Sequence, residues 1–288
     1  MKAISQELTS EQADSFSLVL SSQGISHQIV QYGRKWVIFV EDTHYDAAES
    51  TIAQYLEENE NYSGAAEYLG VRYQKTFSGL WAACILMIVH VRIATEQDAA
   101  LIIKEYGASA YHILGGELYR VVTSLMLHAD MLHLGSNMVG IALFGTAVCA
   151  ITGWGIGWLL LLISGALGNT FNAIAYQTGH LSIGASTTVF GGIGILCAYQ
   201  FMRKINFPGK KLKAFIPIGA GLALLGFLGS AKHSDLLAHL FGFVAGIFLG
   251  IVYAYFIKTP PDQRYQTGAF VIFLLLIILS WTKSLVFG

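Results

Sequence analysis

Apolar runs separated by short polar or glycine-rich breaks fill most of the chain after residue 76. A helix needs about 20 mostly apolar residues to cross a bilayer. No Lys, Arg, Asp or Glu occurs from Met131 to Met202, so this long stretch must contain several spans. The pattern predicts seven membrane-spanning helices, near residues 77–94, 132–151, 154–176, 186–202, 214–230, 236–257 and 269–286.

The first part of the chain has a different pattern. Residues 9–23 have one apolar helical face, and "SHQIVQYG" and "KWVIFVE" predict two strands joined near Gly33. "DTHYDAAESTIAQYLEEN" then predicts a second helix. We therefore expect a small soluble α+β domain over residues 1–62, followed by a linker over residues 63–76. Farther on, residues 95–127 are too polar to span, and "SAYHILGGELYR" within them is expected to fold at the membrane interface.

Composition supports a membrane protein. The chain is 54% hydrophobic and 12% charged, whereas soluble domains carry about 25% charged residues. Residues 1–76 have 11 acidic and 5 basic side chains, and the remainder has 7 acidic and 12 basic ones. Neither part has the basic stripe of a nucleic-acid-binding protein, so we expect no nucleic-acid partner. The three cysteines lie in apolar runs and have no disulfide or zinc spacing.

The basic residues predict the orientation of the chain, because Lys and Arg in short loops favour the cytoplasmic side. They flank the first predicted span and lie between spans four and five and between spans six and seven. These residues are Arg72, Lys75, Arg203, Lys204, Lys210, Lys211, Lys213, Lys258 and Arg264. All of them fall on one side if the N-terminus is cytoplasmic, which places the C-terminus outside.

Few polar side chains within the predicted spans are suited to catalysis. There is no deep Asp or Glu and no H-E-x-x-H, which excludes an intramembrane aspartyl protease and a zinc protease of that type. Ser186 and His239 lie at similar depth below the outer surface, and a neutral imidazole is the usual base for a serine nucleophile. Taken singly, a membrane serine usually bonds its own backbone, and a buried histidine is more often a packing residue.

Two further features of the predicted spans bear on the same chemistry. His133 and Asn137 share a helix face, and Asn137 and the Ser186 amide are candidate donors to an oxyanion. A metal is less favoured, because His128 and His133 diverge by about 140° on a helix. Small residues repeat every four positions in the sixth span and allow close helix approach; they are Ala238, Gly242, Gly246 and Gly250.

Four motifs, in this order, resemble those of the rhomboid family of intramembrane serine proteases. "YR" at 119–120 resembles the family's Trp-Arg pair, and residues 128–137 fit H-x₄-H-x₃-N. "GAS" at 184–186 fits the start of G-x-S-G, and "AHLFGFVAG" fits A-H-x-x-G-x-x-x-G. The resemblance implies a six-helix core over residues 77–257, with residues 258–288 forming a loop and a seventh, peripheral helix. It covers residues 1–60 only loosely.

The resemblance also implies roles for residues. Ser186 would be the nucleophile and His239 the base, without an aspartate or any cofactor or metal. His133, Asn137 and the Ser186 amide would form the oxyanion hole, and Arg120 would hold the first loop. The supporting positions are His128, Gly184, Phe190 and Gly242. The substrates would be transmembrane proteins cut near the outer surface of a bacterial inner membrane.

Two positions depart from the family pattern. Thr187 replaces the glycine after the serine, where a larger residue would either crowd the approach to the scissile carbonyl or be tolerated at a helix start. Phe190 replaces a tyrosine, which keeps a ring for His239 but loses a hydroxyl. These departures leave open a pseudoprotease that binds membrane clients without cutting them. A transporter or channel has only the seven spans in its favour, and the absence of buried charge counts against it.

Overall fold

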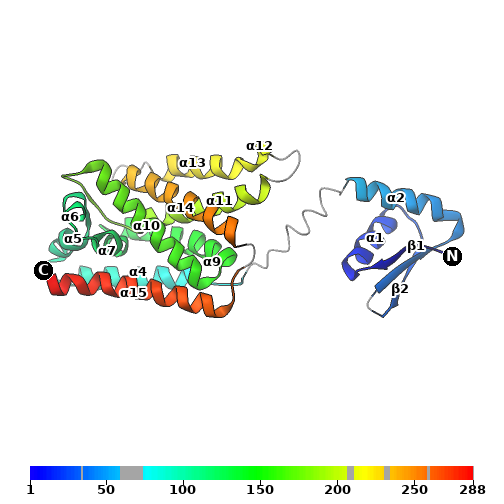
Figure 1. Cartoon of the computed structure of the whole chain (residues 1–288), viewed down its shortest axis with the longest axis horizontal. Coiled ribbons are helices and arrows are strands. Elements are labelled where there is room, and N and C mark those ends of the chain that lie inside the picture. The colour runs from blue at the N-terminus through cyan, green and yellow to red at the C-terminus, as the bar shows by residue number, and fades with distance from the viewer. Residues whose placement is uncertain (34, 59–73, 206–210, 230–233, 258–259, 288) are drawn as a thin grey trace. The chain divides into compact units, whose positions relative to one another are not determined.

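The computed structural model describes residues 1–33, 35–58, 74–205, 211–229, 234–257 and 260–287. The chain divides into two compact units, Met1–Arg72 and Tyr73–Gly288 (Figure 1). The predicted linker, residues 63–76, lies mostly outside the described residues.

The N-terminal unit is a three-stranded antiparallel sheet with two helices. Its elements are β1 (Lys2–Leu8), α1 (Ser10–Ser22), β2 (His27–Tyr32), β3 (Lys35–Val40), η1 (Asp42–His44) and α2 (Tyr45–Glu58). The strand order is β1-β3-β2. Thr9 and Gln12 form a capping box that begins α1, and Leu20 and Ile38 are fully buried between the helices and the sheet.

Strand β1 was not predicted from the sequence. Its pairing with β3 is irregular between Ala3 and Ser5 and again between Ser5 and Leu8. Each irregularity breaks the alternation of inward and outward residues, so the sequence has no two-residue hydrophobic period there. The central β3 has regular pairing with β2 and was predicted.

In the described residues of the second unit, the regular structure is helical apart from one short strand pair. Its elements are α4 (Ser78–Ala94), α5 (Ala99–Tyr106), β4 (Ala108–Ser109), α6 (Ala110–Leu114), α7 (Arg120–Thr123), η2 (Ser124–Met126), α8 (Met131–Gly140), η3 (Ile141–Gly145), α9 (Thr146–Thr152), α10 (Trp154–Tyr176), β5 (Leu181–Ser182), α11 (Ser186–Lys204), α12 (Lys211–Ala214), α13 (Ile216–Leu228), α14 (Leu236–Phe256) and α15 (Gln263–Phe287). The prediction of a mostly helical chain with a small sheet near its N-terminus is confirmed.

Four helical stretches of the described chain are long and apolar enough to cross a membrane: 131–152, 154–176, 236–256 and 263–282. The apolar helices 78–94 and 212–228 are shorter. Helix α11 has 19 residues, most of them buried, and many are small or polar. Because other helices cover α11, its sequence does not need the apolar surface of a lipid-facing span. Seven spans were predicted, and four meet the requirements of length and hydropathy.

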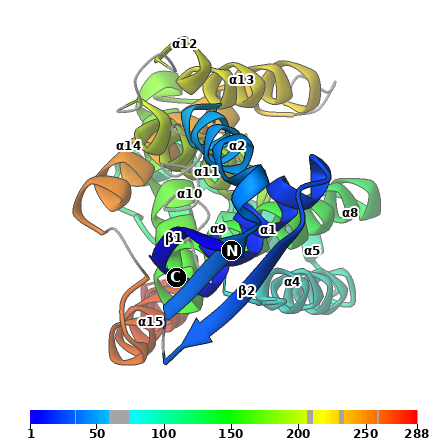
Figure 2. The same ribbon diagram turned by 90° about the vertical axis from the view of Figure 1, so that its right-hand side faces the viewer.

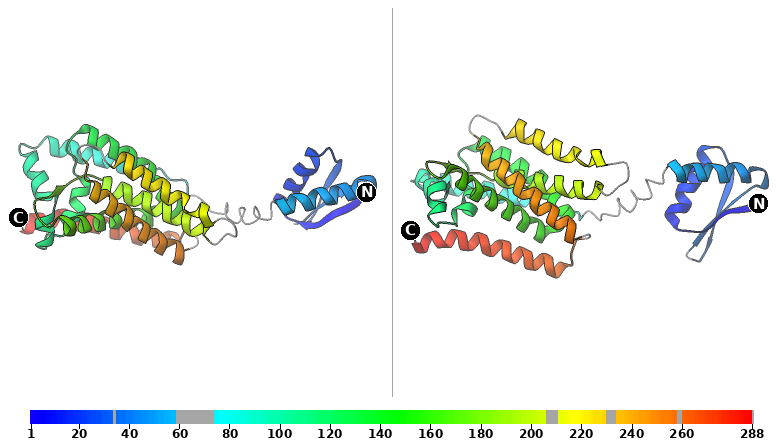
Figure 3. Two further views of the ribbon diagram at one scale, coloured as in Figure 1. Left: turned by 90° about the horizontal axis from the view of Figure 1, so that it is seen from above. Right: turned by 45° about the horizontal axis from the view of Figure 1, so that its top comes forward.

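Helix α11 lies inside this unit and packs against both α10 and α14, while α13 and α15 lie on opposite sides (Figures 1 and 3). The end-on view also places α4 at the periphery (Figure 2). Helix α15 begins six residues before the predicted seventh span. Its first turns carry the buried Gln266, whose side-chain oxygen accepts hydrogen bonds from the amides of Gly155 and Ile156. Because Gln266 is polar, the hydropathy pattern does not show where this helix begins.

Candidate functional site

Ser186 is the first residue of α11 and follows a sharp turn. Gly184 has φ +120°, a backbone conformation that favours glycine, and its amide donates to the carbonyl of Ser124 at 2.9 Å. This turn directs the Ser186 side chain toward α14, where its Oγ lies 2.7 Å from Nε2 of His239. Two residues 53 positions apart in the chain are thereby in hydrogen-bond contact.

The second contact of the His239 ring fixes its tautomer. Nδ1 lies 3.3 Å from the carbonyl oxygen of Gly229, at the end of α13. Because a carbonyl only accepts, Nδ1 carries the proton, and Nε2 of the neutral ring accepts the Ser186 hydroxyl. The Phe190 ring packs on the imidazole at 4.7 Å with a tilt of 31°. His239 is only 4% exposed, so it has little access to competing water.

Close approach of α11 and α14 brings the serine and the histidine together. A Cβ added at Gly242 would lie 2.2 Å from the carbonyl oxygen of Thr187, and one added at Gly246 would lie 2.0 Å from that of Gly191. Neither position has room for a side chain. The four-residue spacing of small residues therefore corresponds to a real backbone contact.

His133 and Asn137 lie beside the turn that precedes Ser186. Asp130 caps α8 by accepting from the His133 amide at 2.8 Å, so both side chains start from a fixed helix end. A Cβ added at Gly184 would lie 2.6 Å from His133 Nε2 and 3.4 Å from Asn137 Nδ2. The side-chain Nδ2 of Asn137 also donates to the backbone carbonyl of His133 at 3.0 Å. Two side chains that can donate hydrogen bonds thus face the turn at Gly184.

The Thr187 side chain is buried where α11 packs against α10 and α14. Its side chain is 2% exposed, and its hydroxyl donates to Oδ1 of Asn169 at 3.2 Å. Its methyl group contacts Gly168 of α10 and Gly242 of α14. The residue therefore fills the space between three helices, and crowding of the approach to Ser186 is not observed. This packing could not be predicted from the sequence, because the partner Asn169 lies on another helix.

Thr187→Gly is accordingly expected to destabilise the protein. It removes a buried hydroxyl and methyl, leaves Asn169 without that donor and adds a helical glycine, which together cost about 2 kcal/mol. Thermal unfolding in detergent measures this, and Thr187→Ser, which keeps the hydroxyl, is the matched control with a smaller loss. Unchanged stability together with faster catalysis in Thr187→Gly would instead show that Thr187 obstructs the site.

His128 lies beneath the same turn. Its Nε2 accepts from the Ala185 amide at a long 3.4 Å, and its ring packs edge-on to His133 at 5.2 Å. Burial, aided by the neighbouring histidines, lowers the pKa of His128 to about 4, so the ring is neutral near pH 7. It supports the backbone before Ser186 but is not hydrogen-bonded to the Ser186 hydroxyl, which contacts His239. Within the described ranges, no three metal-ligating side chains form a group that could hold a metal.

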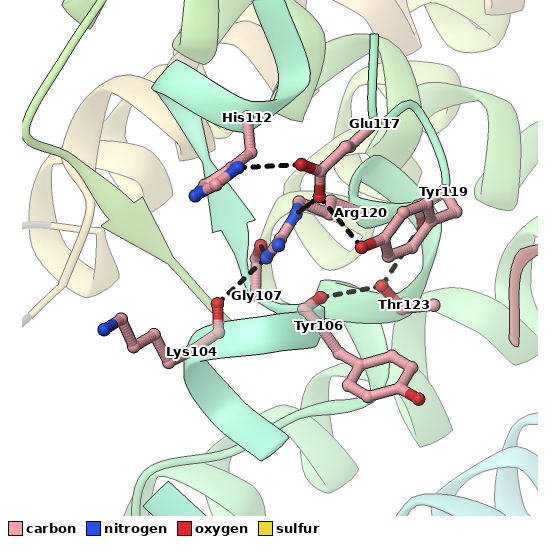
Figure 4. A network of polar contacts seen from close by, with 8 residues as sticks. All are labelled: Lys104, Tyr106, Gly107, His112, Glu117, Tyr119, Arg120 and Thr123. Atoms are coloured by element: carbon pink, nitrogen blue, oxygen red, sulfur yellow. Dashed lines mark hydrogen bonds and ion pairs between the residues drawn. The ribbon is translucent and has the colours of Figure 1, made fainter. Parts of the chain in front are cut away.

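Arg120 is the first residue of α7, in the segment between α5 and α8, and belongs to a polar network of its own (Figure 4). It is 5% exposed, and its guanidinium donates to Glu117 at 2.7 Å and to the carbonyls of Lys104 and Gly107 at 2.9 and 3.3 Å. The predicted interfacial segment is therefore an ordered loop that closes around one buried cation.

Glu117 is the centre of this network, and the sequence analysis missed it. Tyr119 and His112 also reach its carboxylate, at 2.9 and 2.8 Å (Figure 4). Burial alone would raise the pKa of Glu117, but the hydrogen bonds from Arg120, Tyr119 and His112 outweigh it and hold that pKa below its usual value. No helical spacing signalled this pair, because Glu117 lies before α7 begins at Arg120.

Arg120→Ala is expected to lower the free energy of unfolding by about 2 kcal/mol, because it leaves a carboxylate and two carbonyls without their buried donor. Arg92→Ala is the matched control. Arg92 also pairs with a glutamate, Glu96, but it is 70% exposed, and such pairs contribute about 0–1 kcal/mol. Thermal unfolding of the two variants in detergent measures the difference, and equal losses would contradict the assignment of a loop-holding role to Arg120.

Known proteins resemble the second unit. A family model described as a Rhomboid domain matches residues 115–256. "Putative rhomboid protease YdcA" of Bacillus subtilis is 29% identical over 49% of this chain and 69% of its own length. "Rhomboid-like protease 3" of Toxoplasma gondii is 33% identical over 50% of this chain and 55% of its own. "Inactive rhomboid protein 2" of Homo sapiens is 26% identical over 59% and 20%.

Several long apolar helices around a core that holds polar side chains define the chain as a multi-pass integral membrane protein. It belongs to the rhomboid family. That family contains proteins named as proteases and at least one named as inactive. Two of these three relatives are matched over less than two thirds of their length, so activity, substrates and partners are matters for proposal.

Proposed function

We propose that this protein is an intramembrane serine protease with Ser186 as nucleophile and His239 as general base. The observation that carries the proposal is the 2.7 Å contact between Ser186 Oγ and His239 Nε2. A serine hydroxyl is a weak nucleophile unless a base at hydrogen-bond distance takes its proton. The bond from Nδ1 to Gly229 leaves Nε2 free to accept that proton.

The proposal assigns a residue to each step of peptide hydrolysis. His239 takes the Ser186 proton as Oγ attacks the scissile carbonyl, and the same proton then goes to the leaving amine. Water then attacks the acyl-enzyme while His239 takes its proton, and the carboxylic acid is released as that proton returns to Ser186 Oγ. The negative oxygen of each tetrahedral intermediate would accept from the Ser186 amide at the start of α11, from Asn137 and from His133. The Gly229 carbonyl would stabilise the positive charge on the His239 ring through its hydrogen bond with Nδ1.

The family and the charge pattern support a proposal for the substrates and the setting. We propose that transmembrane proteins are cut near the outer surface of a bacterial inner membrane, with the bilayer as the second partner. Residues 1–62 would then lie in the cytoplasm and the C-terminus outside, with α15 as an added seventh helix. The proposal assigns no cofactor to the reaction.

Asn137→Ala is expected to lower kcat more than it raises KM, because an oxyanion donor acts mainly on charge that develops in the transition state. Loss of one such donor costs about 10²–10³-fold in soluble proteases. The fall is expected to be about 10-fold here, since His133 and a backbone amide can still donate. Steady-state cleavage in detergent measures it, with circular dichroism to check folding. A kcat equal to wild type would remove Asn137 from the oxyanion site.

A pseudoprotease is the second candidate, because one relative is named as inactive. The two functions are separated by labelling of the purified protein with a fluorophosphonate probe, which reacts only with an activated serine. A protease is labelled in the wild type and not in Ser186→Ala. A folded wild type that resists the probe favours client binding without cleavage.

A further inference from the structure

A buried polar cluster surrounds Asp235, one helical turn before His239. Its carboxylate accepts from Asn172 Nδ2 at 2.6 Å and lies 2.5 Å from Nε2 of His180. The same carboxylate caps α14 by accepting from the Ala238 amide at 3.1 Å. Asp235 is 12% exposed. One side chain therefore gathers α10, α14 and the segment that leads to α11.

The partners of Asp235 are themselves held in place. The His180 ring stacks on Tyr176 at 3.8 Å with only 9° between the planes. The carbonyl of His180 accepts from the Ala110 amide, and the next residues pair β5 with β4. Asn172 is 2% exposed. Asp235 is thus fixed to the loop that contains Arg120 and to the strand that precedes Ser186.

A backbone hydrogen bond links Asp235 to His239. The His239 amide donates to the Asp235 carbonyl at 3.1 Å, so the capping residue sets the position of the turn that carries the imidazole. Asp235 is the residue directly before α14, and His239 lies in the first turn of that helix. The carboxylate consequently places a negative charge near the ring that becomes positive when it takes the Ser186 proton.

Hydrogen bonds keep this carboxylate ionised. Burial would raise the pKa of Asp235, but the bonds from His180 and the Ala238 amide outweigh it and lower that pKa. Among the described residues, the titratable groups that face the pair are His180, beside Asp235, and His133, across the site from His239. Only Asp235 among them can supply a negative charge.

We infer that Asp235 is a positioning residue for the Ser186–His239 pair, anchoring the N-terminus of α14 and stabilising the imidazolium across one helical turn. The inference rests on the proposed function, yet its electrostatic part concerns His239 whether or not the protein cleaves. Asp235 does not contact the reacting atoms. The dyad would then use an aspartate indirectly, through the helix and through space.

The test is Asp235→Asn in the full-length protein in detergent, with the histidine rings isotopically labelled. The amide keeps the cap, because Asn and Asp cap helices equally well, and removes the charge. The midpoint of the His239 titration, assigned with His239→Gln, is expected to fall by about 0.5–1 pH unit. For cleavage, kcat is expected to fall about 10-fold with KM within about twofold.

Asp130→Asn is the matched control. Asp130 also caps a helix, three residues before His133, but it is exposed, so we expect a near-wild-type midpoint and kcat. His180→Gln tests the same idea without touching the carboxylate, and its His239 midpoint should stay at or above the wild-type value. An unmoved midpoint in Asp235→Asn, or an equal fall in either other variant, would overturn the inference. If wild type cleaves nothing, the proposed function fails, and the titration still decides the role of Asp235.

Discussion

Replacing either Ser186 or His239 with alanine is expected to abolish cleavage of a membrane substrate, with a loss of about 10⁴-fold or more. The double variant is expected to be no worse than either single one. Nucleophile and base act as one unit, because the hydroxyl is not activated without the base and the base has no proton to take without the hydroxyl. Initial rates with purified protein in detergent, normalised to folded protein, measure all three variants.

Phe190→Leu provides the comparison for this pair. It removes the ring that packs on His239 but keeps a buried apolar side chain and both reacting groups, so part of the activity should remain. A Ser186→Ala protein that cuts at the wild-type rate, with contaminating proteases excluded, would contradict the proposal of a serine protease. Additive losses in the double variant would show that the two residues act separately.

Gly242→Ala is expected to be the most damaging change outside the reacting pair. The new methyl would lie 2.2 Å from the carbonyl oxygen of Thr187, and a backbone atom cannot move aside as a flexible side chain can. Helices α11 and α14 must separate, which stretches the 2.7 Å contact between Ser186 and His239. We expect a loss of about 1–3 kcal/mol of stability and a fall in kcat of about 10²-fold, as for other small misplacements of reacting groups.

Gly219→Ala is the matched control, because it makes the same substitution in helix α13 where no atom lies within 4 Å of the added carbon. Its stability and kcat should equal or exceed those of wild type, since alanine favours a helix over glycine by about 1 kcal/mol. Thermal unfolding and steady-state cleavage compare the two. A Gly242→Ala enzyme with wild-type kcat would show that the helix contact does not set the geometry of the site.

Much of the membrane unit could be predicted because hydropathy and glycine spacing are local signals. Helices were found at each of the seven predicted spans, and the four-residue repeat around Gly242 corresponds to the contact between α11 and α14. The similar depth of Ser186 and His239 followed from the span ends alone. Their contact required the fold, since no pattern within either helix specifies which faces meet.

The features that the sequence did not predict depend on long-range partners. Thr187 was interpreted by comparison with a family glycine, but its environment is set by Asn169 on another helix. The sequence analysis assigned no role to Asp235, although its position four residues before His239 was visible. Its pairing with His180 and Asn172 depends on how α10, α14 and the segment before α11 come together. Strand β1 was missed because its register is irregular.

Cleavage in a bilayer tests the central claim most directly. The full-length protein would be reconstituted in liposomes with a panel of single-span proteins, and the products identified by mass spectrometry. The account predicts that wild type releases two fragments by hydrolysis of a bond near the membrane surface on the side of Ser186, and that Ser186→Ala releases none. A folded wild type that retains these proteins in the membrane uncut, and is not labelled by a fluorophosphonate, would contradict it.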